Sequence, residues 1–479
     1  MTNPHSPALR VAVIGGGISG LAAAHRLCEL SPSLRITLFE SKNRLGGVLW
    51  TVRQDGFLIE WGADNFITNV PWGLDLCQRI GFAEQLAQTT SEHRHAFVVR
   101  RGRLHKIPEG FIIMAPSRVW PVVSTPILSP LGKLRMAWEY FIPQSKSDED
   151  ESLAAFVIRR FGRETYERLV QPLVGGIYTG NPEKLSLRAT MPRFQEMERQ
   201  HGSLIRAIWK QMGQRRPESQ GSSGARYSMF VAPRGGMTSL IDTLAARLPD
   251  GTVQLDSPVA NVAPGRGGGW DVSVDGEHPA TSHFDAVILA TPATAGANLV
   301  ASLDQELSGE FRGIPHASCS IVSLAYPRES IGHPMDGFGF VVPLLEDRQI
   351  LSGSFSSVKY DGRAPDGSVL LRVFIGGECQ QELAHLADDA LIRIATEELA
   401  ELMDIRGQPH FAHVIRQPHA MPQYYVGHDQ RLARIAAGFA RQSGLFFTGN
   451  MFDGVGIPHC IRHGERVAQD VAAWCDRQR

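Results

Sequence analysis

The first forty residues hold the pattern that most constrains the fold of this chain. An apolar run over 11–14 is followed by Gly15, Gly17 and Gly20, and a second apolar run ends at Glu40. This order predicts strand, glycine turn, helix and strand, the βαβ unit that binds a dinucleotide. Gly15 permits the tight turn, Gly17 lets backbone approach a pyrophosphate, and Gly20 lets the helix lie close to the sheet. The free N–H groups where the helix starts, at Ile18 and Ser19, would bind the phosphates, and Glu40 would accept hydrogen bonds from a ribose hydroxyl.

A second glycine pair follows the acid. Arg44 comes four residues after Glu40 and precedes Gly46 and Gly47. This arrangement resembles the extended flavin-binding pattern of the glutathione-reductase-like and amine-oxidase-like FAD proteins. The resemblance implies that Arg44 helps to neutralise phosphate and that the backbone at Gly47 passes close to the isoalloxazine. We therefore expect non-covalent FAD as the cofactor.

Composition narrows the classes of protein that remain. The chain has 479 residues, 43% hydrophobic and 20% charged, with a net charge of −1, so nothing favours a nucleic acid as partner. Six cysteines lack C-x-x-C spacing and the histidines lack a zinc motif, so we expect no metal site. Residues 1–9 are polar and lack the apolar core of a secretion signal, which favours a cytoplasmic location.

The predicted fold is α/β with three parts. A Rossmann-type FAD-binding domain is assembled from separate segments, beside a mixed-sheet substrate domain and a helical region suited to membrane contact. We assign 1–90, 227–300 and 426–479 to the FAD-binding domain, 91–212 to the helical region and 301–425 to the substrate-binding sheet. The apolar segment 107–143 is interrupted by several prolines, so short helical pieces are expected there. These pieces suit either a buried substrate-domain core or the surface of a bilayer.

Three motifs carry a more specific resemblance. They are RFGRETYERLVQPLVGGIYTGNPEKLSLRA over 160–189, the pair GFGFVVP (337–343) and YDGRAPDG (360–367), and AMPQYYVGH (420–428) with the later TGNMFDGVGIPHC. Together with the N-terminal unit they span nearly the whole chain. The chain thereby resembles the oxygen-dependent, FAD-containing protoporphyrinogen oxidases, including their bacterial coproporphyrinogen-oxidising relatives.

The resemblance implies a function in haem biosynthesis. A porphyrinogen would lie over the flavin and lose six electrons in three two-electron steps, with O₂ as acceptor and H₂O₂ as by-product. Because the flavin supplies the chemistry, no catalytic side chain is implied. The implied FAD contacts beyond the βαβ unit are Val48, Gly62, Ala63, Asp64, Asn65, Val259, Asn450, Val455, Gly456 and Ile457.

The substrate contacts implied by the resemblance are Gly176, Leu324 and Tyr360. From the residues alone, Gly176 would equally suit the end of a helix, and Leu324 and Tyr360 would suit a core. Where the family has an arginine that pairs with a propionate of the substrate, this chain has Ala96. We name Arg94 as its replacement, and Arg100 and Arg101 lie nearby in the sequence. A tryptophan usual in the family is replaced by Gln417.

Alternatives remain at this point. Protoporphyrinogen IX is the first substrate we expect, weakly favoured by the proline-broken apolar segment, and coproporphyrinogen III is the alternative. A flavin amine oxidase, a carotenoid desaturase and a non-catalytic FAD-binding scaffold are more distant alternatives. The partners expected are a tetrapyrrole, O₂, the inner face of the cell membrane and a ferrochelatase that receives the product, with a homodimer as the oligomeric state to test.

Overall fold

A parallel sheet forms the centre of the first of three regions in the computed structural model, which describes residues 8–214, 229–276 and 279–478. Its five strands lie in the order β12 (Val253–Gln254), β2 (Arg35–Phe39), β1 (Arg10–Ile14), β16 (Ala286–Leu289) and β22 (Leu445–Phe447). These strands come from chain segments far apart in sequence.

Side chains of β1 alternate between two layers that cover this sheet. Val11 and Val13 pack with α1 (Ile18–Leu30), α2 (Trp72–Arg79), α11 (Met237–Ala245) and α17 (Ile457–Gln478). Ala12 and Ile14 pack with β13 (Val259–Pro264), β14 (Trp270–Val274), β15 (Ala280–Phe284), α12 (Ala293–Val300), α13 (Gln305–Arg312) and α16 (His428–Ala440). The sheet is therefore buried on both faces, as parallel sheets generally are.

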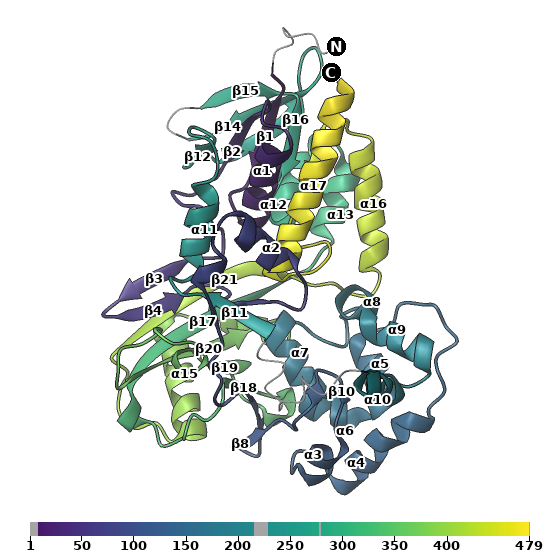
Figure 1. Ribbon diagram of the computed structural model, residues 1–479, viewed down its shortest axis with the longest axis vertical. Helices are drawn as coiled ribbons and strands as arrows, with labels where there is room; N and C mark the ends of the chain where they lie inside the picture. Colours follow the sequence, from purple (N-terminus) through teal and green to yellow (C-terminus); the bar gives the residue numbers. More distant parts are fainter. Residues whose placement is uncertain (1–7, 215–228, 277–278, 479) are drawn as a thin grey trace.

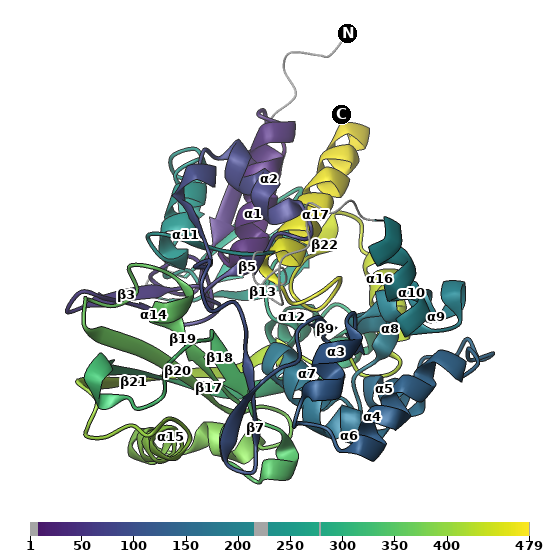
Figure 2. The ribbon, with the colours of Figure 1, turned by 60° about the horizontal axis from the view of Figure 1, so that its bottom comes forward.

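A seven-stranded mixed sheet forms the second region. Its order is β21 (Phe411–Pro422), β17 (His316–Pro327), β20 (Ser368–Gly376), β19 (Ser352–Phe355), β18 (Gly339–Val341), β7 (Phe97–Arg100) and β8 (Arg103–Lys106). Helix α15 (Asp388–Met403) packs on its outer face, as Figure 2 shows. The hairpin of β3 (Thr51–Gln54) and β4 (Phe57–Glu60) packs against the opposite face.

Helices form most of the third region. They are α3 (Val119–Ser124), α4 (Pro130–Ala137), α5 (Leu153–Phe161), α6 (Arg163–Thr165), α7 (Gln171–Tyr178), α8 (Leu187–Thr190), α9 (Pro192–His201) and α10 (Leu204–Gln214), with a π-helical turn at Tyr166–Val170. The segment 91–212 is not helical throughout, because β7 and β8 at its start complete the seven-stranded sheet. No helix in the described part of the chain is long and apolar enough to cross a membrane.

Candidate cofactor and substrate site

The first glycine turn is tightly packed at Gly15 and Gly20 and open at Gly17. Gly15 has φ +111°, and a Cβ there would lie 2.4 Å from the Ala290 carbonyl oxygen. A Cβ at Gly20 would lie 2.0 Å from the Gly15 carbonyl oxygen. A Cβ at Gly17 would meet nothing within 4 Å. The turn thus packs tightly against the sheet while the side at Gly17 leaves room for a ligand at the start of α1.

Glu40 fixes this turn from the end of β2. Its Oε2 accepts the Gly16 N–H at 2.8 Å and its Oε1 accepts the Lys42 N–H at 2.9 Å. A carboxylate has about four lone-pair sites, so Glu40 retains capacity for a ribose hydroxyl. The Ser257 N–H donates to the Glu40 carbonyl at 2.8 Å. Val259, two residues further along the chain, therefore lies near Glu40.

The second glycine turn lies directly against the first. The Gly46 N–H donates to the Gly16 carbonyl at 2.8 Å, and a Cβ at Gly47 would lie 3.5 Å from the Gly17 Cα. Arg44 donates to the carbonyls of Leu45 at 3.2 Å and Gly47 at 2.9 Å. The observed contacts of Arg44 therefore shape this turn.

The loop after β4 lies next to the second turn. A Cβ at Gly62 would be 2.3 Å from the Val48 carbonyl oxygen, so the two segments are in close contact. The Val48 side chain is 49% exposed and Ala63 is exposed. Asn65 donates to Asp64 at 2.5 Å. The segments of Gly17, Gly47, Val48 and Ala63 are thus neighbours, and a Cβ at Gly17 would meet nothing within 4 Å.

The start of α17 lies at the same edge of the sheet as the glycine turns. Both α1 and α17 follow parallel strands, so their N-termini lie at the same edge of the sheet, and Figure 1 shows the two helices side by side. A Cβ at Gly464 would be 2.3 Å from the Ser19 carbonyl oxygen. Since α17 starts at Ile457, its N-terminus extends about 10 Å beyond that of α1 at 1.5 Å per residue. The preceding segment holds Asn450, Val455 and Gly456, and Asn450 donates to Ala420 at 3.3 Å.

Two helix N-termini at the same edge of the sheet, offset by about 10 Å along the helix axes, suit an elongated anionic ligand. A dinucleotide with its pyrophosphate at α1 and its second ring system near α17 matches this arrangement. The geometry therefore fits FAD, with the positive end of α17 directed at the flavin end.

A buried cluster of charges joins this groove to the seven-stranded sheet. Asp64 lies 3.4 Å from Lys359 and 3.6 Å from Arg372, and Arg372 donates to the Gly62 carbonyl at 2.5 Å. Arg363 lies 3.4 Å from Glu60, and both are 3% exposed. The Arg372 Nε has no hydrogen-bond partner among the described residues.

The pKa values in this cluster are shifted in opposite directions. Burial lowers the pKa of Lys359, an effect that Asp64 partly offsets and that Arg372 and Arg363 reinforce. Burial alone would raise the pKa of Asp64, but Lys359, Arg372 and Arg363 outweigh it and hold that pKa below its usual value. Sequence reasoning missed Lys359 and Arg372, although an arginine inside the apolar run VLLRVFIGG was a signal for the second.

The four proposed substrate residues do not form one cluster. Gly176 lies within α7, which ends at Tyr178 rather than at this glycine, and a Cβ at 176 would be 3.3 Å from Val341 Cγ1. Tyr360 is buried, with Lys359 Nζ and Arg363 Cζ each 5.6 Å from its ring centroid. Of the four, Tyr360 is the one that adjoins the charge cluster.

Leu324 and Arg94 lie elsewhere. Leu324 is fully buried in the core beneath α15, whereas its neighbour Ser323 pairs with Arg372 across the sheet and shares its face. Because successive side chains of a strand alternate, Leu324 faces away from the Asp64 side. Arg94 donates to the carbonyls of Thr90 at 2.8 Å and Thr89 at 3.0 Å, so its observed contacts hold a loop.

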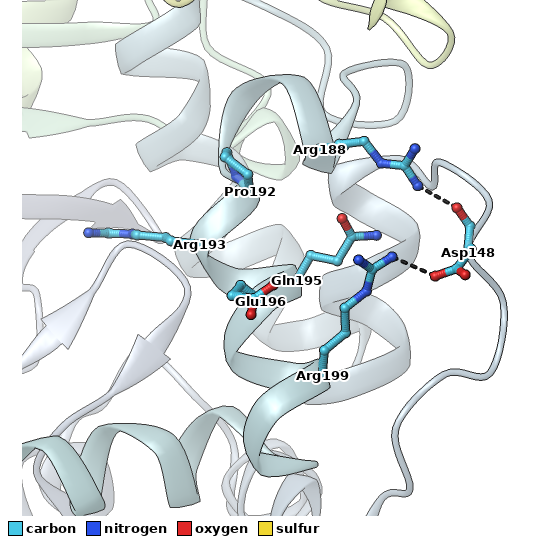
Figure 3. Close-up of a pocket in the computed structure, with 7 residues that line it drawn as sticks. All are labelled: Asp148, Arg188, Pro192, Arg193, Gln195, Glu196 and Arg199. Carbon is cyan, nitrogen blue, oxygen red and sulfur yellow. Dashed lines mark hydrogen bonds and ion pairs between the residues drawn. The ribbon is translucent and has the colours of Figure 1, made fainter.

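A separate hollow of about 610 Å³ lies on the helical region, shown in Figure 3. Arg199 pairs with Asp148 at 2.7 Å, and Arg188 donates to the Asp148 carbonyl. Its lining residues are Asp148, Arg188, Pro192, Arg193, Gln195, Glu196 and Arg199. None of the predicted site residues lines it.

Comparisons with known proteins also point to a flavin-containing protein. Residues 18–472 match the family described as flavin containing amine oxidoreductase. The coproporphyrinogen III oxidase of Bacillus subtilis is 32% identical, over 97% of this chain and 98% of that protein. Protoporphyrinogen oxidase 2 of Arabidopsis thaliana is 28% identical, over 98% and 94% of the two chains. A crystal structure from Exiguobacterium sp. 255-15, of a protein provisionally named a protoporphyrinogen oxidase, is 28% identical with a TM-score of 0.85, covering 97% of this chain and 99% of that one.

Proposed function

Since this chain belongs to the flavin-containing amine oxidoreductase family, we propose that it acts as an FAD-dependent porphyrinogen oxidase of haem biosynthesis. The observation that supports the cofactor is the pair of adjoining glycine turns, which is open at Gly17 and lies at the sheet edge where α1 and α17 begin. The full-length similarity to porphyrinogen oxidases carries the substrate class.

Each part of the groove has a role toward FAD. The N–H groups at Ile18 and Ser19 bind the pyrophosphate, and Glu40 accepts from the ribose. Arg44 holds the Gly47 carbonyl and so keeps the second turn against the first. The start of α17 at Ile457, with Val455 and Gly456 before it, would present its positive end to the flavin of bound FAD, a cofactor that supplies two-electron redox chemistry.

The substrate enters from the side of α7. Gly176 is exposed there, and the absence of a side chain at 176 leaves space for a flat macrocycle beside Val341. Molecular oxygen is the electron acceptor we propose, with one H₂O₂ formed for each pair of electrons. Delivery of the product to a ferrochelatase and assembly as a homodimer stay predictions of the family resemblance.

Two substrates are compatible with this proposal. Protoporphyrinogen IX remains the first candidate substrate. Coproporphyrinogen III is the second candidate, and it is favoured by the 32% identity to a bacterial coproporphyrinogen III oxidase, against 28% to the plant protoporphyrinogen oxidase. The test is aerobic incubation with each compound, following porphyrin fluorescence and H₂O₂. Oxidation of putrescine or cyclohexylamine instead of either porphyrinogen would contradict the proposal.

Membrane contact is assigned to one apolar face of the helical region. Leu131, Leu134 and Trp138 are 78%, 68% and 61% exposed and lie at helical spacing along α4 and the following turn. Trp120 on α3 is 76% exposed and Phe141 is 67% exposed. In Figure 1, α3 and α4 lie at the end of the molecule opposite the termini. Exposed tryptophans and leucines of this kind suit the interface of a bilayer.

Vesicle flotation tests this apolar face. Wild-type protein should float with vesicles of phosphatidylglycerol and phosphatidylethanolamine, and a Trp120→Ser, Leu131→Ser, Trp138→Ser variant should remain in the dense fraction. The matched control is the double variant Leu30→Ser, Leu255→Ser. It removes two leucines that are 39% and 40% exposed and lie in the region of the five-stranded parallel sheet. Equal flotation of the two variants would refute the assignment.

A further inference from the structure

The charges of the buried cluster around Asp64 do not balance. Lys359, the last residue of α14 (Ser356–Lys359), and Arg372 of β20 both pair with Asp64, at 3.4 and 3.6 Å. Arg363 pairs with Glu60 of β4 at 3.4 Å. Within the described part of the chain, three cations thus share two carboxylates in this cluster, which leaves one net positive charge.

One backbone segment separates this cluster from the second glycine turn. Arg372 donates to the Gly62 carbonyl at 2.5 Å. A Cβ at Gly62 would lie 2.3 Å from the Val48 carbonyl oxygen, so these two segments are in contact. Val48 directly follows Gly47, where an added Cβ would lie 3.5 Å from the Gly17 Cα of the first turn. The cluster therefore lies behind the turn near which the flavin-binding pattern implies the isoalloxazine.

The excess positive charge is enclosed by the protein. The side chains of Arg363 and Arg372 are 3% and 2% exposed, and that of Lys359 is 15% exposed. The three cations hold the pKa of Asp64 below its usual value although its burial acts in the opposite direction, so the potential inside the cluster is positive. The Arg372 Nε has no hydrogen-bond partner among the described residues. Because an unbalanced buried charge is costly, this excess points to an anion that the described residues do not supply.

Reduction of FAD supplies negative charge on the glycine-turn side of this cluster. A hydride brings one proton and two electrons, so its transfer adds one unit of negative charge to the isoalloxazine. We propose that the net positive charge maintained by Lys359 stabilises this negative charge and thereby raises the reduction potential of the bound flavin. The inference rests on the FAD site of the proposed function. Lys359 stays protonated beside Asp64 and acts through its charge alone, as a tuning residue that transfers no proton.

Sulfite binding to the FAD-bound protein measures this effect without a substrate, because the sulfite adduct places negative charge on the isoalloxazine. At neutral pH, Lys359→Met should weaken sulfite binding roughly 10- to 20-fold, the effect of one unit charge about 10 Å away at an effective dielectric constant of about 20. The same variant should lower the two-electron reduction potential by about 30–40 mV, since a factor of ten corresponds to about 30 mV. Lys359→Arg keeps the charge and should bind sulfite as wild type does.

The matched control removes a lysine from the same sheet. Lys106 of β8 is 56% exposed and pairs with Asp336 at 2.6 Å. Because water screens an exposed charge, Lys106→Met should leave both the sulfite affinity and the reduction potential unchanged.

A double variant separates the charge of Lys359 from a structural role. Lys359→Met with Asp64→Asn removes one charge of each sign, so the cluster keeps one net positive charge. Its sulfite affinity should therefore return to about the wild-type value, and Asp64→Asn alone, with two net positive charges, should bind sulfite at least as tightly as wild type. Titration with FAD accompanies each variant, so that loss of the cofactor is recognised.

Two results would overturn the role of the cluster. They are wild-type sulfite affinity in Lys359→Met, and a double variant that binds sulfite as weakly as Lys359→Met does. These readouts require bound FAD but no porphyrinogen. If sulfite affinity follows the net charge while neither porphyrinogen reduces the flavin, the proposed function fails and the role of the cluster stands. If a porphyrinogen reduces the flavin while sulfite affinity ignores the net charge, only the role of the cluster is removed.

Discussion

Substitution of Gly17 by alanine separates the ligand groove from the fold. Gly17 has φ −71° and ψ 175°, a conformation that alanine adopts, and its added Cβ would meet nothing within 4 Å. The apo-protein should therefore lose at most about 1 kcal/mol of unfolding free energy, the cost of alanine in place of glycine at a helix N-cap. If pyrophosphate lies against Gly17, however, the methyl group occupies ligand space.

The expected loss of FAD affinity follows from that conflict. An extra methyl in a packed site costs about 1–3 kcal/mol. At about 1.4 kcal/mol per factor of ten, this raises the Kd roughly 5- to 150-fold. The assay is titration of apo-protein with FAD by flavin fluorescence, together with urea unfolding of the apo-protein.

Two other glycines serve as controls for Gly17→Ala. Gly309 on α13 is exposed and its Cβ would also meet nothing within 4 Å, so Gly309→Ala should leave the Kd for FAD unchanged. Gly20→Ala should destabilise the apo-protein itself, because its Cβ would lie 2.0 Å from the Gly15 carbonyl oxygen. Wild-type FAD affinity in Gly17→Ala would refute the placement of the pyrophosphate.

Three further substitutions test other parts of the site. Gly176→Leu should retain FAD but lose anaerobic flavin reduction by a porphyrinogen, because the new side chain at this exposed position would fill the space proposed for the macrocycle; reduction at the wild-type rate would place the substrate elsewhere. Arg372→Met should lower the unfolding free energy measured in urea by about 3–5 kcal/mol, since it removes one partner of a buried charge pair; a loss below about 1 kcal/mol would mean that Asp64 and Gly62 find other partners. Asp64→Asn tests the pH dependence. The folded-state pKa of Asp64 lies below its ordinary value of 3.8. Its stabilisation should therefore be fully present above about pH 5, and be lost as pH falls through the lower folded pKa. The difference in unfolding free energy between wild type and this variant should shrink accordingly, and a difference constant down to pH 2 would contradict the shift.

Local patterns in the sequence were sufficient to predict the secondary structure around the first glycine turn. The strand, glycine turn, helix and strand over 10–40 are confirmed as β1, α1 and β2, because the glycine spacing and the apolar runs are both short-range signals. The tight contacts at Gly15 and Gly20 have the physical cause assigned to those glycines, the close packing of helix on turn.

Contacts between distant segments lay beyond such patterns. Lys359 and Asp64 are 295 residues apart in sequence, and no periodicity joins them. The face on which Leu324 lies depends on the register of β17 against β20, where a shift of one residue reverses every side chain. Strands β7 and β8 could be recognised as a hairpin around Gly102, but their pairing with β18 in the substrate sheet is non-local. Leu324 and Arg94 therefore stay predictions as substrate contacts, while Ser323 and Arg372 lie on the face toward Asp64.

Anaerobic mixing of the purified FAD-bound protein with protoporphyrinogen IX and, separately, with coproporphyrinogen III tests the central claim most directly. The flavin absorbance should bleach with at least one of them, and admission of air should restore it with the appearance of porphyrin fluorescence and H₂O₂. Bleaching with one compound alone would also identify the substrate. A flavin that neither porphyrinogen reduces, and that a primary amine does reduce, would contradict the account.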